Sequence, residues 1–207
     1  MTPEVLADAV AAVDAAVSRT AGRVIVGVAG PPGAGKSTLA SAIATARAGA
    51  MVPMDGFHLA NAELRRLGRA DRKGAPDTFD AAGFVHLLRR LRAADPVETV
   101  YAPAFTRALE EPVAGSIPVA PHAGLVVVEG NYLLVPDEPW AAIRPLLDLA
   151  IYLDAPDATR VGSLLRRARA RGLDDAATHD WVYRNDEANA RLIAATRPLA
   201  DLVLTRS

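Results

Sequence analysis

Residues 30–37 combine the residue types and the spacing that a phosphate-binding loop (P-loop) requires. They read GPPGAGKS and match the pattern G-x-x-x-x-G-K-[S/T] at every fixed position. An apolar strand pattern precedes them and a helical pattern follows, which is the context in which this motif binds phosphate. A chance glycine turn before a helix is the alternative. The residues predicted to bind a nucleotide are Gly30, Gly33, Ala34, Gly35, Lys36, Ser37 and Thr38.

The chemistry expected of this loop is that of ATP bound with Mg²⁺. Its glycines allow backbone N–H groups to approach phosphate oxygens closely, and the following helix adds a positive partial charge. Lys36 can then bridge the β- and γ-phosphates, and the hydroxyl of Ser37 can hold Mg²⁺.

Two carboxylates follow apolar strand patterns and are candidates for the same site. Asp55 comes directly after the strand expected at 50–54, where it could orient an acceptor hydroxyl and take its proton. A turn residue before Gly56 is the alternative. Glu129 ends the run VVVE and could reach Mg²⁺ or a metal-bound water, unless it is only a solvent-exposed strand end.

A group of arginines between residues 160 and 172 predicts a mobile lid. A helix rich in arginine could close over ATP and neutralise the transferring phosphoryl group, with Arg166, Arg167 and Arg171 as candidates. The alternative is a solvated helix face paired with Asp174 and Asp175.

Alternation of short β-branched runs with helical patterns predicts an α/β fold. We expect a P-loop three-layer sandwich with a mostly parallel central sheet, formed by one domain over 1–207 with a lid at about 160–174. The strands are expected at 23–29, 50–54, 97–101, 125–129, 149–153 and 201–205. The helices are expected at 2–18, 37–47, from 80 onward, 157–170 and 175–195, and the proline-rich stretch 102–124 is expected to be a loop or hairpin.

Composition excludes several classes of protein. A net charge of −1 over 207 residues does not suit a nucleic-acid-binding domain. The chain has no cysteine, and its four histidines are far apart, so thiolate and histidine metal sites are not expected. No export signal or membrane span is indicated, which favours a cytoplasmic protein. A homodimer is open, because the alanine-rich helices indicate no clear interface.

The motifs of other P-loop proteins are missing from the sequence. There is no N-K-x-D stretch to bind guanine and no LSGG stretch of a transport ATPase. A helicase core would be larger and more basic, which leaves small-molecule kinases. Several segments together resemble the phosphoribulokinase/uridine kinase family of P-loop kinases, which includes bacterial pantothenate kinase. They are GPPGAGKST at 30–38, MDGFHL at 54–59, RKGAPDTFD at 72–80, APAFTR at 102–107, VVVEGNYLL at 126–134 and NDEANA at 185–190.

This resemblance implies ATP-dependent phosphorylation of a hydroxyl group on a small polar metabolite. It implies Asp55 as the base and Glu129 as an acid linked to Mg²⁺. It also implies an acceptor pocket lined by His58, Arg72, Asp77, Tyr101 and Arg107. Thr106 stands where this group usually has an aspartate, and Gly162 and Ser163 stand where uridine kinases carry basic residues.

Two other functions stay open at this point. One is a P-loop ATPase that acts as a regulatory or assembly module without a small acceptor, and the other is a nucleotide-binding protein without catalysis. The acceptor itself is open among nucleosides, sugars, pantothenate-like compounds and ribose phosphates. The segment 185–189 has no chemical role that the sequence indicates.

Overall fold

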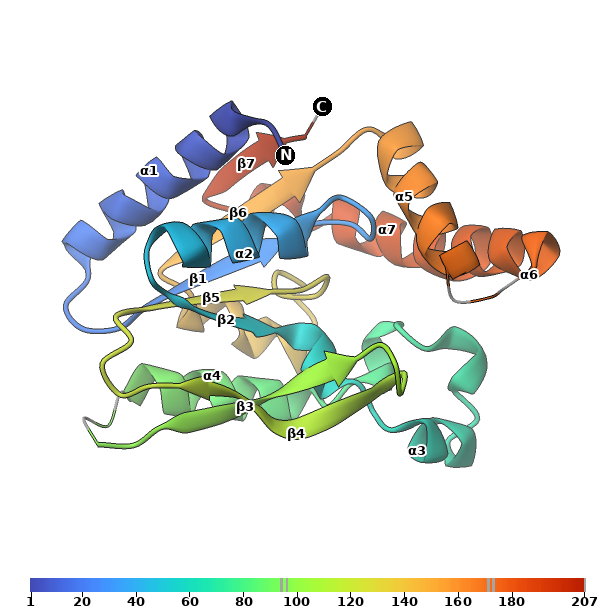
Figure 1. Ribbon diagram of the computed structural model, residues 1–207, viewed down its shortest axis with the longest axis horizontal. Helices are drawn as coiled ribbons and strands as arrows, with labels where there is room; N and C mark the ends of the chain where they lie inside the picture. The colour runs from blue at the N-terminus through green and yellow to red at the C-terminus, as the bar shows by residue number, and fades with distance from the viewer. Residues whose placement is uncertain (94, 96, 171, 173, 207) are drawn as a thin grey trace.

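In the computed structural model, the chain folds around a five-stranded parallel sheet with the strand order β2-β5-β1-β6-β7 (Figure 1). The structure describes residues 1–93, 95, 97–170, 172 and 174–206. The strands of this sheet are β1 Val24–Ala29, β2 Ala50–Pro53, β5 Leu125–Glu129, β6 Leu149–Asp154 and β7 Leu202–Thr205. Each of the four strand pairs is parallel, which confirms the predicted α/β class.

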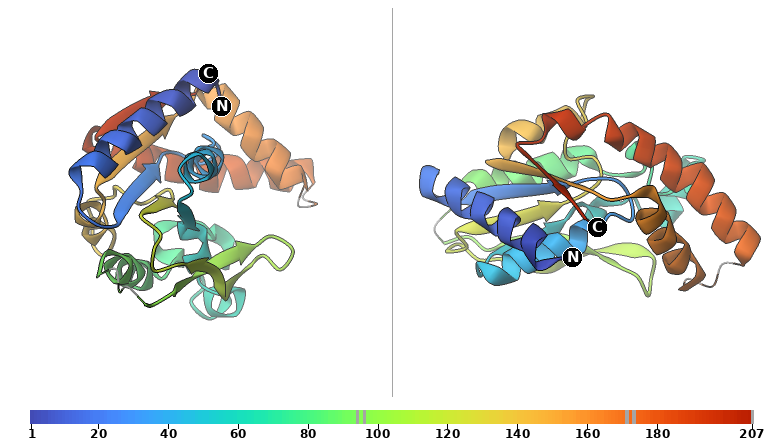
Figure 2. Two further views of the ribbon diagram at one scale, coloured as in Figure 1. Left: turned by 60° about the vertical axis from the view of Figure 1, so that its left-hand side comes forward. Right: turned by 90° about the horizontal axis from the view of Figure 1, so that it is seen from above.

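Strand β1 is apolar throughout because helices cover both faces of the sheet. Val24, Val26 and Val28 pack in one hydrophobic cluster with residues of α1 (Pro3–Arg19) and α2 (Lys36–Ala46). Ile25 and Ala29 point to the other face, into a cluster with residues of α4 (Ala81–Ala93) and α7 (Glu187–Ala194). The result is the three-layer arrangement seen in Figure 2.

The starts of two predicted helices are confirmed, together with the side chains expected to cap them. At α1, the hydroxyl of Thr2 accepts a hydrogen bond from the backbone N–H of Val5 at 3.5 Å. At α4, the Asp80 carboxylate accepts one from the N–H of Gly83 at 2.8 Å. Both bonds satisfy N–H groups that have no partner within the helix.

The proline-rich stretch forms an antiparallel hairpin of β3 (Val100–Thr106) and β4 (Glu111–Val119). The strand predicted at 97–101 is wrong at its start, because the N–H groups of Val97 and Glu98 bond to the Asp95 carboxylate in a turn. Val97 is consequently 85% exposed.

The single helix predicted for 175–195 is also wrong. The structure has α6 (Asp175–Asp180), a π-helical segment Trp181–Asp186, and then α7. The wider π-helical turn lets Val182 pack against α5 (Asp157–Ala170) while Asn185 faces the backbone of Lys73. Apolar periodicity alone does not reveal such a change of pitch.

Residues 54–80 adopt short elements that the sequence analysis did not resolve. They are α3 (Asn61–Arg66) and the 3₁₀ turns Met54–Phe57, Ala70–Arg72 and Pro76–Thr78. The loops after β1, β2 and β5 meet at the carboxyl edge of the sheet, as expected for parallel neighbours. In Figure 1, α5 and α6 extend beyond this edge, on the other side of it from the hairpin. Among the described residues, no helix is both long enough and apolar enough to span a bilayer.

Candidate functional site

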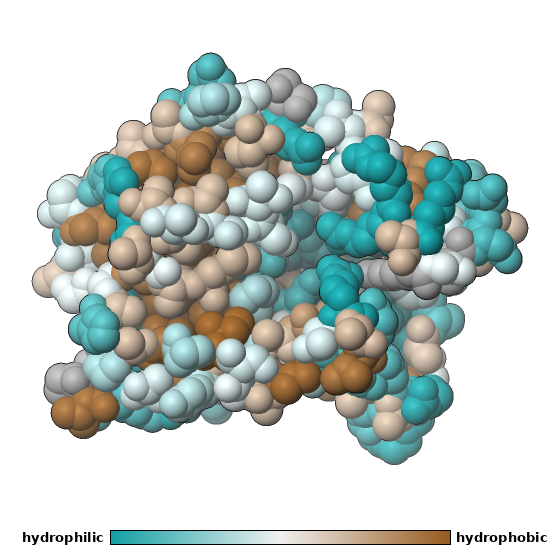
Figure 3. Space-filling model, in the orientation of Figure 1, coloured by the Kyte–Doolittle hydropathy of each residue, from teal (hydrophilic) through white to brown (hydrophobic). Residues whose placement is uncertain are grey.

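A pocket of about 240 Å³ opens at the carboxyl edge of the sheet. The P-loop and Glu129 form one side, Asp55 and His58 form another, and residues of α5 and α7 complete it. Hydrophilic residues gather around the hollow in this face of the molecule (Figure 3). The pocket therefore brings together residues from segments that are far apart in the sequence.

Close packing explains why the P-loop needs glycine at two positions. A Cβ atom on Gly30 would lie 2.2 Å from the carbonyl oxygen of Leu153, and Gly30 has a φ of 144°. A Cβ atom on Gly33 would lie 2.4 Å from the carbonyl oxygen of Arg160, and Gly33 has a φ of 81°. The loop is thus clamped between β6 and the first turn of α5, so its backbone N–H groups are held in place before a ligand binds.

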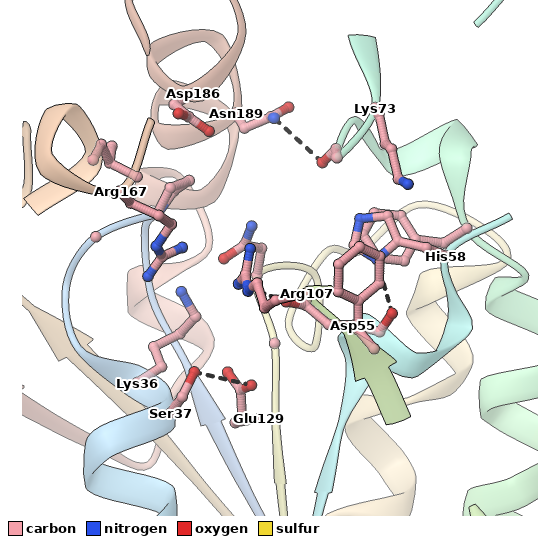
Figure 4. A pocket seen from close by; sticks show the side chains of 18 of the residues that line it. Lys36, Ser37, Asp55, His58, Lys73, Arg107, Glu129, Arg167, Asp186 and Asn189 are labelled. Atoms are coloured by element: carbon pink, nitrogen blue, oxygen red, sulfur yellow. Dashed lines mark hydrogen bonds and ion pairs between the residues drawn. The ribbon is translucent and has the colours of Figure 1, made fainter. Parts of the chain in front are cut away.

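Lys36 is buried at the base of the pocket, where its ammonium group donates a hydrogen bond to the Pro31 carbonyl at 3.0 Å. Burial lowers the pKa of Lys36 to about 8, although the carboxylates of Glu129 and Asp55 oppose the shift. In Figure 4 this side chain points toward the centre of the pocket, with Arg167 beside it. Two cations therefore face the space in which phosphate groups would lie.

Ser37 and Glu129 form the second part of the P-loop side. The hydroxyl of Ser37 donates to a carboxylate oxygen of Glu129 at 3.1 Å (Figure 4). Burial and the nearby Asp55 carboxylate together raise the pKa of Glu129 to about 7, although Lys36 opposes the shift.

These two oxygen groups fit a Mg²⁺ ion that takes most of its ligands from nucleotide phosphates and water. Among the described residues there is no group of three or more His, Asp or Glu side chains that would form an all-protein metal cage.

Asp55 lies on the 3₁₀ turn that follows β2, with its side chain 40% exposed to the pocket. Its carboxylate lies 3.9 Å from the guanidinium of Arg107. Its backbone carbonyl accepts a hydrogen bond from Nδ1 of His58 at 2.8 Å, so Nδ1 of this imidazole carries the proton. Burial lowers the pKa of His58, the carboxylate and the backbone carbonyl of Asp55 oppose this shift, and the nearby charges of Lys73 and Arg107 act in the same direction as burial. His58 therefore presents a neutral ring whose Nε2 can accept a hydrogen bond.

Not all the residues implied by the resemblance line the pocket. His58 and Arg107 do, but Arg72 and Asp77 form a surface ion pair at 2.6 Å, and Tyr101 is 57% exposed on β3. Their expected role in binding an acceptor stays a prediction.

The three candidate lid arginines also differ. Arg167 lines the pocket, whereas Arg166 is exposed and donates to the hydroxyl of Ser163 at 3.1 Å. Arg171 lies outside the described residues.

Several lining residues were missed by the sequence analysis, namely Lys73, Phe79, Phe105, Glu110, Asn131, Trp181, Asp186 and Asn189. Lys73 had a visible signal, because it is one of only two lysines in the chain and the other is Lys36. Phe79 and Phe105 lie in the segments 72–80 and 102–107 that carry the resemblance, whereas Trp181 had no signal, since a ring in the core and a ring in a pocket have the same pattern in the sequence.

The segment 185–189, which had no role from the sequence, connects three parts of the site. Asn185 donates to the carbonyl of Lys73 at 3.0 Å, and Asn189 donates to that of Gly74 at 3.3 Å. Glu187 binds the buried guanidinium of Arg160 with both carboxylate oxygens. This segment therefore bonds both to α5 and to the loop 73–74, and Asp186 within it faces the pocket (Figure 4).

Comparison with known proteins decides the family. A model of the "Phosphoribulokinase / Uridine kinase family" matches residues 25–207. The chain belongs to this family. It is a P-loop kinase, and the family implies that it binds ATP, as the sequence motifs indicated.

Individual relatives differ in what they are named for. A candidate uridine kinase of Schizosaccharomyces pombe is 35% identical over 88% of this chain and 83% of that protein. A pantothenate kinase of Mycolicibacterium vanbaalenii is 30% identical over 88% of this chain and 66% of that protein. A crystal structure from Silicibacter sp. TM1040, described as a candidate fructose transport system kinase, has a TM-score of 0.85 with 39% identity, over 99% of both chains. These names point to different molecules, so they do not establish the acceptor.

Proposed function

We propose that this kinase transfers the γ-phosphoryl group of ATP to a hydroxyl group of a small polar metabolite. The observation that carries this proposal is the convergence of Lys36, Ser37, Glu129 and Asp55 in one pocket. The first three suit a nucleotide with its metal, and Asp55 stands across the pocket as a carboxylate able to accept a proton.

The nucleotide side of the pocket has a defined task in this proposal. The backbone of the P-loop and the ammonium group of Lys36 bind the phosphates, and Ser37 and Glu129 would hold Mg²⁺. When bound, Mg²⁺ supplies positive charge against the phosphate oxygens. Lys36 and Arg167 supply further positive charge where negative charge develops during transfer.

On the acceptor side, Asp55 orients the hydroxyl group and takes its proton. The hydroxyl oxygen then forms a bond to the γ-phosphorus, the bond between that phosphorus and the β–γ bridging oxygen breaks, and ADP leaves. The protein forms no covalent bond to the phosphoryl group in this proposal, because positioning of the reactants and stabilisation of charge provide most of the rate enhancement.

We further propose that the chain acts as one catalytic domain with a lid at about 160–174. Support comes from α5, which extends beyond the edge of the sheet and directs Arg167 into the pocket (Figures 1 and 4). Closure over ATP would exclude water and reduce unproductive hydrolysis.

The experiment that tests this function measures ADP release over a panel of nucleosides, sugars, sugar phosphates, polyols and hydroxy acids, followed by mass detection of the phosphorylated product. We expect at least one compound to raise ADP release well above the basal rate and to gain one phosphoryl group. Hydrolysis of ATP that no compound changes, combined with stimulation by a protein partner, would instead support a regulatory ATPase. Binding of ATP without any turnover would support a non-catalytic nucleotide-binding protein.

A further inference from the structure

A second pocket, of about 390 Å³, lies on the face of the sheet that α7 covers. Its walls come from Pro31 of the P-loop, from the end of β6, from the first turn of α5 and from one face of α7. Among the described residues, none lines both this pocket and the one that contains Lys36 and Asp55. The P-loop therefore contributes residues to two separate pockets.

Short side chains on α7 leave the space for this second pocket. Four residues of the helix line it at spacings of three and four positions, so they share one face of the helix: Glu187, Ala190, Arg191 and Ala194. The two alanines extend little toward β6. Room for a ligand therefore depends on positions 190 and 194.

The hydroxyl group of Tyr152 reaches this pocket without a partner. Tyr152 is 1% exposed and its ring packs in the core, yet its hydroxyl group forms no hydrogen bond with any described residue. Burial and the Asp154 carboxylate raise the pKa of Tyr152 to about 12, although Arg197 and Arg160 oppose the shift. The hydroxyl group is therefore neutral and lies among the charged side chains of the pocket. Because buried hydroxyl groups are normally hydrogen-bonded, we expect its partner to come from within the pocket.

Two of the carboxylates that line the pocket are already engaged by a buried cation. Glu187 binds the guanidinium of Arg160 with both carboxylate oxygens, and Asp157 accepts a hydrogen bond from the same group at 2.8 Å. The side chain of Asp157 is 85% exposed, so water screens its charge. Among the described residues, no group of His, Asp or Glu side chains could hold a metal ion. These acids therefore do not favour a cationic ligand.

The groups with unused capacity in this pocket are hydrogen-bond donors. The guanidinium of Arg191 forms no ion pair or hydrogen bond with any described residue. Arg197 is half exposed and lies 3.4 Å from the Asp154 carboxylate, which is longer than a charge-assisted hydrogen bond. A guanidinium can bind an oxyanion with two N–H groups at once. Together with the hydroxyl group of Tyr152, these side chains suit a ligand that brings oxygen acceptors and negative charge.

We propose that this second pocket binds a small metabolite through a phosphate or carboxylate group and acts as an effector site for nucleotide binding. Arg191, Arg197 and the hydroxyl group of Tyr152 donate hydrogen bonds to the anionic group. The space beside Ala190 and Ala194 takes the rest of the molecule. This inference does not depend on which acceptor the kinase uses.

The link to nucleotide binding runs through two residues that line the second pocket and also contact the P-loop or its lysine. Pro31 accepts the hydrogen bond of the Lys36 ammonium group on its carbonyl oxygen. Arg160 lines the pocket with its side chain, and its backbone carbonyl packs against Gly33. A ligand that shifts either residue alters the loop that binds the phosphates. Such coupling is reciprocal, so the nucleotide must change the affinity for the anion by the same factor.

Isothermal titration calorimetry tests the binding site with inorganic phosphate, glycerol 3-phosphate and citrate, and with glycerol as the neutral comparison. The protein is kept saturated with a non-hydrolysable ATP analogue and Mg²⁺, so that the P-loop is already filled. We expect at least one anion to bind and glycerol not to bind. Tyr152→Phe should weaken the binding of that anion by about 3- to 10-fold, and Arg191→Gln by about 10-fold or more.

Control variants separate ligand binding from a structural role. Tyr152→Phe should not lower the melting temperature in the absence of anions, because the hydroxyl group has no partner to lose. Ala194→Leu fills the pocket from an exposed position and should abolish binding, whereas Ala195→Leu changes an exposed neighbour outside the pocket and should preserve it. Arg89→Gln removes an exposed cation on α4 and should leave the affinity for the anion unchanged.

The effector role is tested by titrating the ATP analogue with and without the anion that binds most tightly. We expect the affinity for the analogue to change by about fivefold or more, and this change to be absent in Arg191→Gln. A change that persists in Arg191→Gln would be competition at the P-loop and would overturn the effector role. An unchanged nucleotide affinity would also overturn that role and leave a ligand site alone. Absence of anion binding, or binding that is equal in Tyr152→Phe, Arg191→Gln and the unmodified protein, would overturn the site itself.

Discussion

At the scale of single residues, burial at the base of the pocket disfavours the charged forms of Lys36 and Glu129. Lys36 and Glu129 are both buried, and burial shifts the pKa of each toward the neutral form. Each also lies close enough to the other for the opposite charge to counteract that shift. A triphosphate bound with its metal adds negative and positive charge to this same space. The site is thus arranged for a highly charged ligand rather than for an apolar one.

Asp55 is the residue on which the proposed transfer step depends most. Asp55→Asn keeps the size of the side chain but removes its ability to take a proton. We expect kcat to fall by about 100- to 10,000-fold while the affinity for ATP stays within about twofold. Steady-state kinetics and a nucleotide titration measure the two quantities.

A surface carboxylate provides the matched control for that substitution. Asp14 is exposed on α1 and pairs with Arg47, away from the pocket, so Asp14→Asn should keep full activity. Turnover close to that of the unmodified protein in Asp55→Asn would remove Asp55 as the base.

His58 should make the stability of the protein depend on pH in a defined window. Its pKa is lowered by burial in the folded chain, whereas the unfolded chain binds a proton at its ordinary value of about 6.5. Protonation therefore favours the unfolded state. The stabilisation that the neutral ring provides is complete above pH 6.5 and is lost as the pH falls below it.

Urea unfolding at pH values between about 7.5 and 5.5 checks this expectation. The free energy of unfolding should fall more steeply with decreasing pH in the unmodified protein than in His58→Phe, by up to about 1.4 kcal/mol per pH unit. His122→Asn, which removes an exposed histidine, serves as the comparison. Equal slopes for the unmodified protein and His58→Phe would show that burial of His58 has no such effect.

At the scale of elements, the π-helical segment and α7 connect the two halves of the pocket. Glu187 on α7 binds the guanidinium of Arg160, whose side chain is only 6% exposed, so α5 is fixed to α7 by a nearly buried ion pair. Asn185 and Asn189 hold the carbonyls of Lys73 and Gly74 from the same stretch. A wide turn just before α7 allows these side chains to face different partners.

Asn185→Asp tests this connection with almost no change in shape. A carboxylate cannot donate a hydrogen bond to the carbonyl of Lys73, and the two oxygens repel each other. We expect the free energy of unfolding to fall by about 1–3 kcal/mol and the KM for the acceptor to rise. The affinity for ATP should change little, because Asn185 donates its hydrogen bond to the backbone of Lys73.

Asn185→Ala gives the comparison without the added charge. It should show a smaller increase in the acceptor KM than Asn185→Asp, since it leaves the carbonyl unpaired without repelling it. A parallel increase in the KM values for ATP and for the acceptor would contradict a specific role in holding the loop 73–74.

At the scale of the whole molecule, the sheet and the helices packed on it form the core, and α5 with α6 extends beyond them (Figure 1). If α5 closes over the nucleotide, hydrogen exchange of its backbone amides should slow when a non-hydrolysable ATP analogue and Mg²⁺ are bound. Amides of α1, which packs on one face of the sheet with Val24, Val26 and Val28 of β1, should show no change in exchange. The measurement is hydrogen exchange followed by mass spectrometry.

Arg167→Met should reduce that protection, because Arg167 is the arginine of α5 that lines the pocket. Arg166→Met provides the matched comparison, since Arg166 is on the same helix but is exposed and bonded to Ser163. Protection that is confined to residues 30–38 would show that α5 does not act as a lid.

Local sequence patterns were sufficient for the parts of the protein that repeat a regular geometry. The strand at Val24–Ala29, the P-loop after it and the helix from Lys36 follow from an apolar run, three glycines and a helical pattern in direct succession. Asp55 and Glu129 could be placed near the loop because the carboxyl ends of neighbouring parallel strands meet at one edge. Short-range preferences and a single topological rule account for these predictions.

Tertiary structure alone decided the acceptor end of the pocket and the connection made by residues 185–189. The sequence did not reveal that Lys73 and Arg107 meet at Phe105, because they lie on different irregular segments whose positions depend on packing with distant elements. Nor did it reveal that Asn185 would bond to a carbonyl 112 positions away in the chain. Contacts between segments so far apart depend on how all the elements pack together, whereas the P-loop depends mainly on its own residues.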